Sequence, residues 1–207
     1  MIQIIRRMAS ILALLALAAC GADHKWASDA EISAARFVAA PPATITLFTV
    51  INNKNGSGAH SSLMINGAER VLYDPAGSWH HSTVPERNDL QYGISDRMLN
   101  YYMDYHARQS YDLIEQVIVV TPEIAAMVEQ RAIAEGSANQ GYCSISVSSI
   151  LQGVPGFSTI SSTYFPKALS RDFGKIAGVT TKVLKDDDID DHHGVLVVQA
   201  NGDPGGI

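Results

Sequence analysis

Cysteine is scarce in this chain, because 207 residues contain only two of them. Two cysteines are too few for a disulfide framework, so a hydrophobic core must hold the fold together. Charge is also modest at 17% of residues, and the net charge of −6 argues against nucleic acid as a partner. No second long hydrophobic run follows the N-terminus. The hydrophobic content of 46% is that of a globular protein large enough for one ordinary domain.

The first twenty residues have the layout of a secretory signal. Arg6 and Arg7 form a positive start, and an apolar stretch over residues 11–17 is short for a membrane span. The stretch Leu17-Ala18-Ala19-Cys20 resembles a bacterial lipobox, in which the cysteine is lipidated and becomes the new N-terminus. The alternatives are a plain signal peptide and an uncleaved anchor. The lipobox predicts a protein anchored to a lipid bilayer rather than one that spans it.

This N-terminus also predicts a location and a division of the chain. Gly21 follows the cysteine, which by resemblance to Gram-negative lipoproteins implies the outer membrane, facing the periplasm. We expect a signal peptide over residues 1–19, a tether over 20–42 with room for a short helix, a folded domain over 43–200 and a flexible tail over 201–207.

Hydrophobic periodicity and turn residues divide the domain into elements of both kinds. We predict strands over residues 43–51, 60–65, 70–73, 113–120, 179–184 and 194–198, and helices over 96–108, 121–135, 143–151 and 166–177. A long irregular loop is expected over 78–94. Hairpins that alternate with separate helices predict an α+β fold.

Cys143 is the cysteine left for chemistry if Cys20 carries lipid. An unpaired thiol in an oxidising compartment needs a reason. Cys143 follows a polar loop and opens an apolar, helix-like run, and a thiolate at a helix N-terminus is stabilised by the helix dipole and by free N–H groups. We interpret Cys143 as a nucleophile; the alternative is a buried structural cysteine.

His60 and Asp74 are the candidate partners of this thiol. His60 opens the second predicted strand and Asp74 closes the third, with the turn-forming pair Asn66-Gly67 between them. The start of one strand and the end of the next lie side by side in a hairpin, so the carboxylate is expected to accept a hydrogen bond from the imidazole. The expected order is thiol, imidazole, carboxylate.

These stretches resemble the circularly permuted papain-like proteins of the NlpC/P60 superfamily. The matching segments run over residues 58–65, 71–77 and 142–151. The resemblance implies an antiparallel sheet packed with helices, with Cys143 as nucleophile, His60 as base and Asp74 as orienting residue, although the third role varies within the superfamily. It implies a thiol hydrolase, an amidase or peptidase, that needs no cofactor.

The resemblance and the envelope location together imply an amide of peptidoglycan peptides as substrate. Acyl lipids are a second possibility, because permuted members include acyltransferases and amidases that act on them. A third reading is a binding or structural lipoprotein without catalytic activity. The backbone N–H of Cys143 would hold the oxyanion, helped by Gln140, Asn139 or Tyr142. An ordinary polar loop is the alternative for these three residues.

Three other features have simpler interpretations. His80 and His81 are expected to be a histidine pair on a surface loop. The acidic run over residues 186–193 does not fit a calcium loop, because Asp191 stands where glycine is needed, and we predict a solvated turn with no metal site. Trp79 is expected in a cleft wall or lid, with a core plug as the alternative. A helical stripe is expected to face the core, though some of its members suit the cleft: Met98, Tyr101, Tyr102 and Tyr105.

Overall fold

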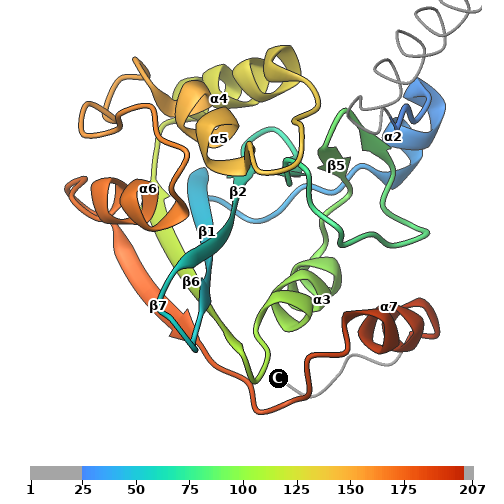
Figure 1. Cartoon of the computed structure of the whole chain (residues 1–207). Helices are drawn as coiled ribbons and strands as arrows, with labels where there is room; N and C mark the ends of the chain where they lie inside the picture. Colours follow the sequence, from blue (N-terminus) through green and yellow to red (C-terminus); the bar gives the residue numbers. More distant parts are fainter. Residues whose placement is uncertain (1–24, 203–207) are drawn as a thin grey trace, which may run out of the picture.

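A computed structural model describes residues 25–202 of the chain. Its centre is a seven-stranded sheet in the order β4-β5-β3-β2-β1-β6-β7, in which all neighbours are antiparallel (Figure 1). The strands are β1 Thr44–Asn52, β2 Gly58–Asn66, β3 Arg70–Tyr73, β4 Glu86–Arg87, β5 Leu90–Tyr92, β6 Tyr111–Val119 and β7 Thr180–Leu184. The helices are α2 Asp29–Ala35, α3 Asp96–His106, α4 Pro122–Glu135, α5 Cys143–Leu151, α6 Pro166–Phe173 and α7 His192–Ala200. The predicted α+β class is confirmed.

The sheet is covered by helices on both faces, which gives two hydrophobic cores. On one face, Ile45 and Leu47 of β1 pack with residues of α4, α5 and α6. On the other face, Phe48 and Val50 pack with residues of α3 and α7. The alternation of side chains along a strand therefore places apolar residues in both cores, and the middle of β1 is buried throughout.

Helix starts follow the capping signals in the sequence. The Thr121 hydroxyl accepts from the Ile124 N–H at the start of α4, with Pro122 in the first turn, and α4 ends before Gly136 at a φ of 75°. The Ser95 hydroxyl accepts from the Met98 N–H and starts α3. Helix α5 covers the predicted range, from Cys143 to Leu151.

The predicted strand over residues 194–198 is wrong, because these residues lie in α7. The run of valine and leucine indicated a strand, but tertiary contacts decide the outcome. Asp191 caps the helix by accepting from the Gly194 N–H at 2.9 Å. Buried Gln199 then fixes it to α3, donating to the Tyr101 carbonyl at 2.8 Å and to Asp104 at 3.0 Å.

The prediction of an irregular loop over residues 78–94 is also partly wrong. It contains the short hairpin β4–β5, whose turn places Asn88 and Asp89 at positive φ. Strand β5 pairs with β3 and extends the sheet beyond it. This places the Asp89 carbonyl where it accepts from the Asp74 N–H at 2.9 Å, so the hairpin helps to fix the end of β3.

The N-terminal described residues contact the domain. Arg87 donates to the Ala27 carbonyl and to Asp29 of α2, and the Arg70 N–H donates to the Phe37 carbonyl. The expected signal peptide, the lipobox with Cys20 and most of the expected tail lie outside the described residues. Within residues 25–202, no helix is both long and apolar enough to cross a membrane.

Candidate functional site

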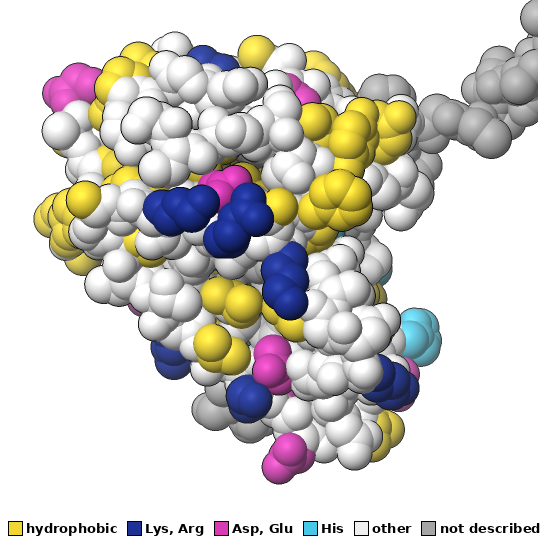
Figure 2. Space-filling view, turned by 60° about the vertical axis from the view of Figure 1, so that its left-hand side comes forward, with side chains coloured by type: hydrophobic (Ala, Val, Ile, Leu, Met, Phe, Trp, Pro, Cys, Tyr) yellow, Lys and Arg dark blue, Asp and Glu magenta, His cyan; other side chains and the backbone are white. Residues whose placement is uncertain are grey.

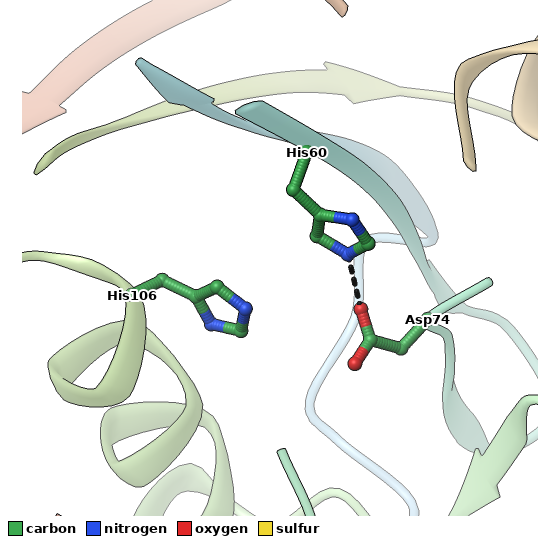
Figure 3. Close-up of side chains that lie close together, drawn as sticks. All are labelled: His60, Asp74 and His106. Carbon is green, nitrogen blue, oxygen red and sulfur yellow. Dashed lines mark hydrogen bonds and ion pairs between the residues drawn. The ribbon is translucent and has the colours of Figure 1, made fainter. Parts of the chain in front are cut away.

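The structure brings His60 and Asp74 together as the hairpin pattern predicts. Strands β2 and β3 pair only as far as Leu63 opposite Tyr73, so Asp74 extends one residue beyond the ladder and His60 lies diagonally across from it. His60 Nε2 lies 2.6 Å from Asp74 Oδ1 (Figure 3). The histidine side chain is 16% exposed and the aspartate side chain is fully buried.

The carboxylate of Asp74 is held by a second layer of hydroxyl groups that sequence reasoning missed. The Tyr102 hydroxyl donates to Asp74 Oδ1 at 3.1 Å. That hydroxyl is also 2.5 Å from the Ser62 hydroxyl, which therefore donates to it. All three side chains are buried. Tyr102 belongs to the predicted core stripe, but its role at the site could not be read from helical periodicity alone.

Cys143 approaches the site along the open edge of β2. Before residue 63, β2 has no β3 neighbour, so residues 58–62 leave that edge of the strand open to other elements. Interactions with the His60 imidazole, the Ser61 backbone and the Ser144 side chain lower the pKa of the thiol. Asp74 engages Nε2 of the His60 ring, which leaves Nδ1 for another partner. The Ser61 and Ser144 hydroxyls, 2.9 Å apart, join β2 to α5.

The electrostatics favour an ion pair between the thiol and the imidazole. Burial alone would lower the pKa of His60, but the charge and hydrogen bond of Asp74, with a smaller effect of Cys143, raise it to about 10. Burial alone would raise the pKa of Cys143, but its hydrogen bond with His60 and the imidazolium charge lower it. Both shifts act in the same direction, because each favours the thiolate beside the imidazolium over the neutral pair.

A second histidine, His106, lies beside the pair. Its ring is parallel to that of His60 within 8°, with centroids 5.7 Å apart. Its Nδ1 lies 2.8 Å from the Tyr102 carbonyl, so Nδ1–H is the donor. Burial is the main cause that lowers the pKa of His106 to about 4, and the ring is neutral at pH 7. Sequence analysis missed it, although position 106 continues the core stripe one turn after Tyr102.

The N-terminus of α5 is available for an oxyanion. None of the described side chains caps the helix at Tyr142, so the first N–H groups of α5 have no side-chain acceptor there. Asn139, Gln140 and Tyr142 lie in the exposed turn before the helix. Their help at an oxyanion stays a prediction, as does that of the Cys143 N–H.

The thiol is buried, because Cys143 is only 7% exposed. The reason is that Cys143 lies at the junction of α5 and β2, next to the fully buried Ser144. A cavity of ≈ 260 Å³ instead opens onto the histidines, and its lining includes His60, Gly77, Ser78, Tyr105 and His106.

Trp79 does not line a cleft. It is 1% exposed, its indole N–H donates to Gln199 Oε1 at 3.0 Å, and its ring meets Tyr102 edge-on. The cleft interpretation was wrong and the core-plug alternative is right. The aromatic stripe faces the core as predicted, because all four of its members are buried.

The remaining sequence candidates lie away from the thiol. His80 is exposed and His81 is partly buried, with Nε2 3.3 Å from the Gln199 carbonyl. The acidic run joins a strand to a helix, not two strands as expected, because α7 follows it. Within it, Asp188 pairs with Arg108 at 3.0 Å and Asp190 accepts from the Ser110 N–H.

Comparison with known proteins identifies no relative of this chain. No family model matches the chain, and no significant match is found among curated proteins or among solved structures. The site is therefore interpreted from its own geometry.

Proposed function

We propose that this protein is a papain-like cysteine hydrolase of the NlpC/P60 type. The observation that carries the proposal is the continuous chain from the Asp74 carboxylate through the His60 imidazole to the Cys143 thiol. A nucleophile, a base and an orienting carboxylate in this order are the parts that covalent acyl transfer requires. The N-terminus of α5 adds N–H donors beside the nucleophile.

The reaction then has two halves. In the first, the Cys143 thiolate attacks the carbonyl carbon of an amide, and the imidazolium of His60 gives its proton to the leaving amine as the C–N bond breaks. In the second, His60 takes a proton from water, which attacks the thioester and releases a carboxylic acid and the thiolate. Asp74 keeps the imidazole in the orientation that presents Nδ1 to the sulfur.

The substrate we propose is an amide of peptidoglycan peptides, supported by the lipobox, the envelope location it implies and the resemblance in sequence. The outer-membrane anchor at Cys20 would hold the domain in the periplasm, near the cell wall. The face in Figure 2 shows basic side chains in small groups beside acidic ones, rather than a continuous basic stripe that would suit nucleic acid.

One observation favours an acyl lipid as second candidate. Tyr142, next to the thiol in sequence, is 45% exposed and meets Tyr164 edge-on with centroids 5.5 Å apart. Phe165 beside it is 72% exposed. Exposed aromatic rings near a nucleophile suit an apolar acyl chain.

The test compares both substrate classes in one set of variants. Purified protein is assayed on soluble muropeptides and on an N-acyl amide, alongside Cys143→Ala, His60→Ala and the control His80→Ala, an exposed histidine. We expect hydrolysis of one class that is lost in the first two variants and kept in the control. If wild type hydrolyses neither substrate faster than Cys143→Ala does, the result would instead support a binding or structural lipoprotein.

A further inference from the structure

The site contains three side chains that could bind a metal ion together, although the proposed hydrolase mechanism uses no metal. One ligand atom each from His60, Asp74 and His106 lie within 4.8 Å of one another (Figure 3). We propose that these three residues form a Zn²⁺ site, and that the bound ion switches off the thiol chemistry. The inhibition rests on the proposed function, whereas the binding does not.

His106 is arranged as metal-binding histidines usually are. Its Nδ1–H donates to the Tyr102 carbonyl at 2.8 Å, so Nε2 carries the free lone pair. A metal-ligating histidine typically gives its other ring N–H to a carbonyl or carboxylate, which fixes the tautomer and the ring. Figure 3 shows this ring directed toward the His60–Asp74 pair. The hydrolase mechanism gives His106 no other task.

Asp74 supplies the second argument, because one of its oxygens is unpaired. Oδ1 is shared by His60 and Tyr102, but Oδ2 is buried and has no hydrogen-bond partner among the described residues. A buried carboxylate oxygen without a partner is costly and needs an explanation. In Figure 3 this oxygen lies on the side that faces His106. A cation bound between the two side chains would satisfy it.

Gly77 allows the Asp74 carboxylate to take its position at the site. A Cβ atom at Gly77 would lie only 1.9 Å from Asp74 Oδ2, so any side chain there would displace the carboxylate. Gly77 also lines the ≈ 260 Å³ cavity that opens onto His60 and His106. The cavity would give an ion a route in, and its volume has room for a water as fourth ligand.

Two imidazoles and one carboxylate with an open position are a common zinc ligand set. Ligand atoms bind zinc at about 2.0–2.2 Å, so the three ligand atoms, which lie within 4.8 Å of one another, must shift to enclose one ion. Zinc takes the place of the proton between His60 Nε2 and Asp74, and that proton leaves to solvent. With Nε2 bound to zinc, the neutral ring keeps its one proton on Nδ1 and has no free lone pair, so His60 can neither take a proton from water nor readily give one to the leaving amine, and turnover stops.

The binding test uses the full-length protein in detergent, stripped with a chelator and titrated with Zn²⁺ by calorimetry. We expect one ion per chain, more than about tenfold weaker binding in His106→Gln, because even second-shell changes cost 10–100-fold, and unchanged binding in the control His80→Gln. Cys143→Ala should keep the site, since the thiol is not a ligand. Circular dichroism checks folding, and Asp74→Asn replaces His106→Gln if that variant does not fold.

Three results would overturn the zinc site. These are no binding by wild type, equal affinity in the folded His106→Gln or Asp74→Asn variant, or a thiolate-to-metal charge-transfer band with Co²⁺, which would place Cys143 among the ligands. The activity arm is separate: each variant is compared with its own zinc-free rate. If the protein binds zinc but hydrolyses nothing even without zinc, the proposed function is refuted and the zinc site stands. If the hydrolysis rate is the same with and without bound zinc, the proposed inhibition is refuted.

Discussion

Replacing Asp74 with asparagine tests how far one buried carboxylate controls the thiol. The substitution keeps the size of the side chain and removes its charge. Asp74 is the largest of the influences that raise the pKa of His60 from 6.5 to about 10. That difference corresponds to roughly 5 kcal/mol in favour of the imidazolium, on the order of 1.4 kcal/mol per pH unit.

The thiol should respond because the imidazolium is what stabilises the thiolate. Asp74→Asn should therefore raise the pKa of Cys143 and lower the thiolate fraction at pH 6; each loss of about 1.4 kcal/mol of thiolate stabilisation lowers that fraction about tenfold. Alkylation by iodoacetamide reports that fraction. Mass spectrometry of the modified peptide separates Cys143 from Cys20.

Tyr102→Phe is the matched comparison, since it removes only one hydrogen bond to the same carboxylate and keeps the ring in the core. We expect a smaller decrease in alkylation rate than for Asp74→Asn. If Asp74→Asn is alkylated at pH 6 as fast as wild type, Asp74 does not control the imidazole, and the electrostatic reasoning fails.

Two other predictions follow from the structure and one from the N-terminal sequence. Trp79→Ala should destabilise the domain by about 3–5 kcal/mol, measured by urea unfolding, because the ring is fully buried; an unchanged midpoint would contradict its place in the core. With a chelator present, kcat/KM should rise with pH as Cys143 ionises below its usual 9.0, and fall as His60 loses its proton near pH 10; a single rise at the ordinary thiol pKa would refute the ion pair. Metabolic labelling with a palmitate analogue should tag wild type but not Cys20→Ser, and label that persists would disprove the lipobox.

Local signals in the sequence were enough for most of the fold. The α+β class, the hairpin of β2 and β3 and the start of α5 at Cys143 follow from strand alternation, turn residues and the change from a polar loop to an apolar run, which act over a few residues. The same signals brought His60 and Asp74 to one place, because a short hairpin fixes its own register.

The failures share a different physical cause. Helix α7 looks like a strand in sequence, and besides the Asp191 cap it is the contacts of Gln199 with Trp79 and α3 that favour a helix. Trp79 looked like a loop residue because its burial depends on the same distant helix. Tyr102 and His106 reach the site from α3. No local sequence pattern predicts that this core-facing helix packs beside the end of the β2–β3 hairpin.

The most direct test of the central claim is to trap the acyl-enzyme. The protein is mixed with an activated ester such as p-nitrophenyl acetate, quenched in acid and digested, and mass spectrometry locates the acyl group. The account predicts an acid-stable thioester on Cys143 that forms quickly in wild type, forms much more slowly in His60→Ala and is absent in Cys143→Ala. Acylation spread over lysines, with Cys143 unmodified, would contradict the claim that this thiol is a nucleophile.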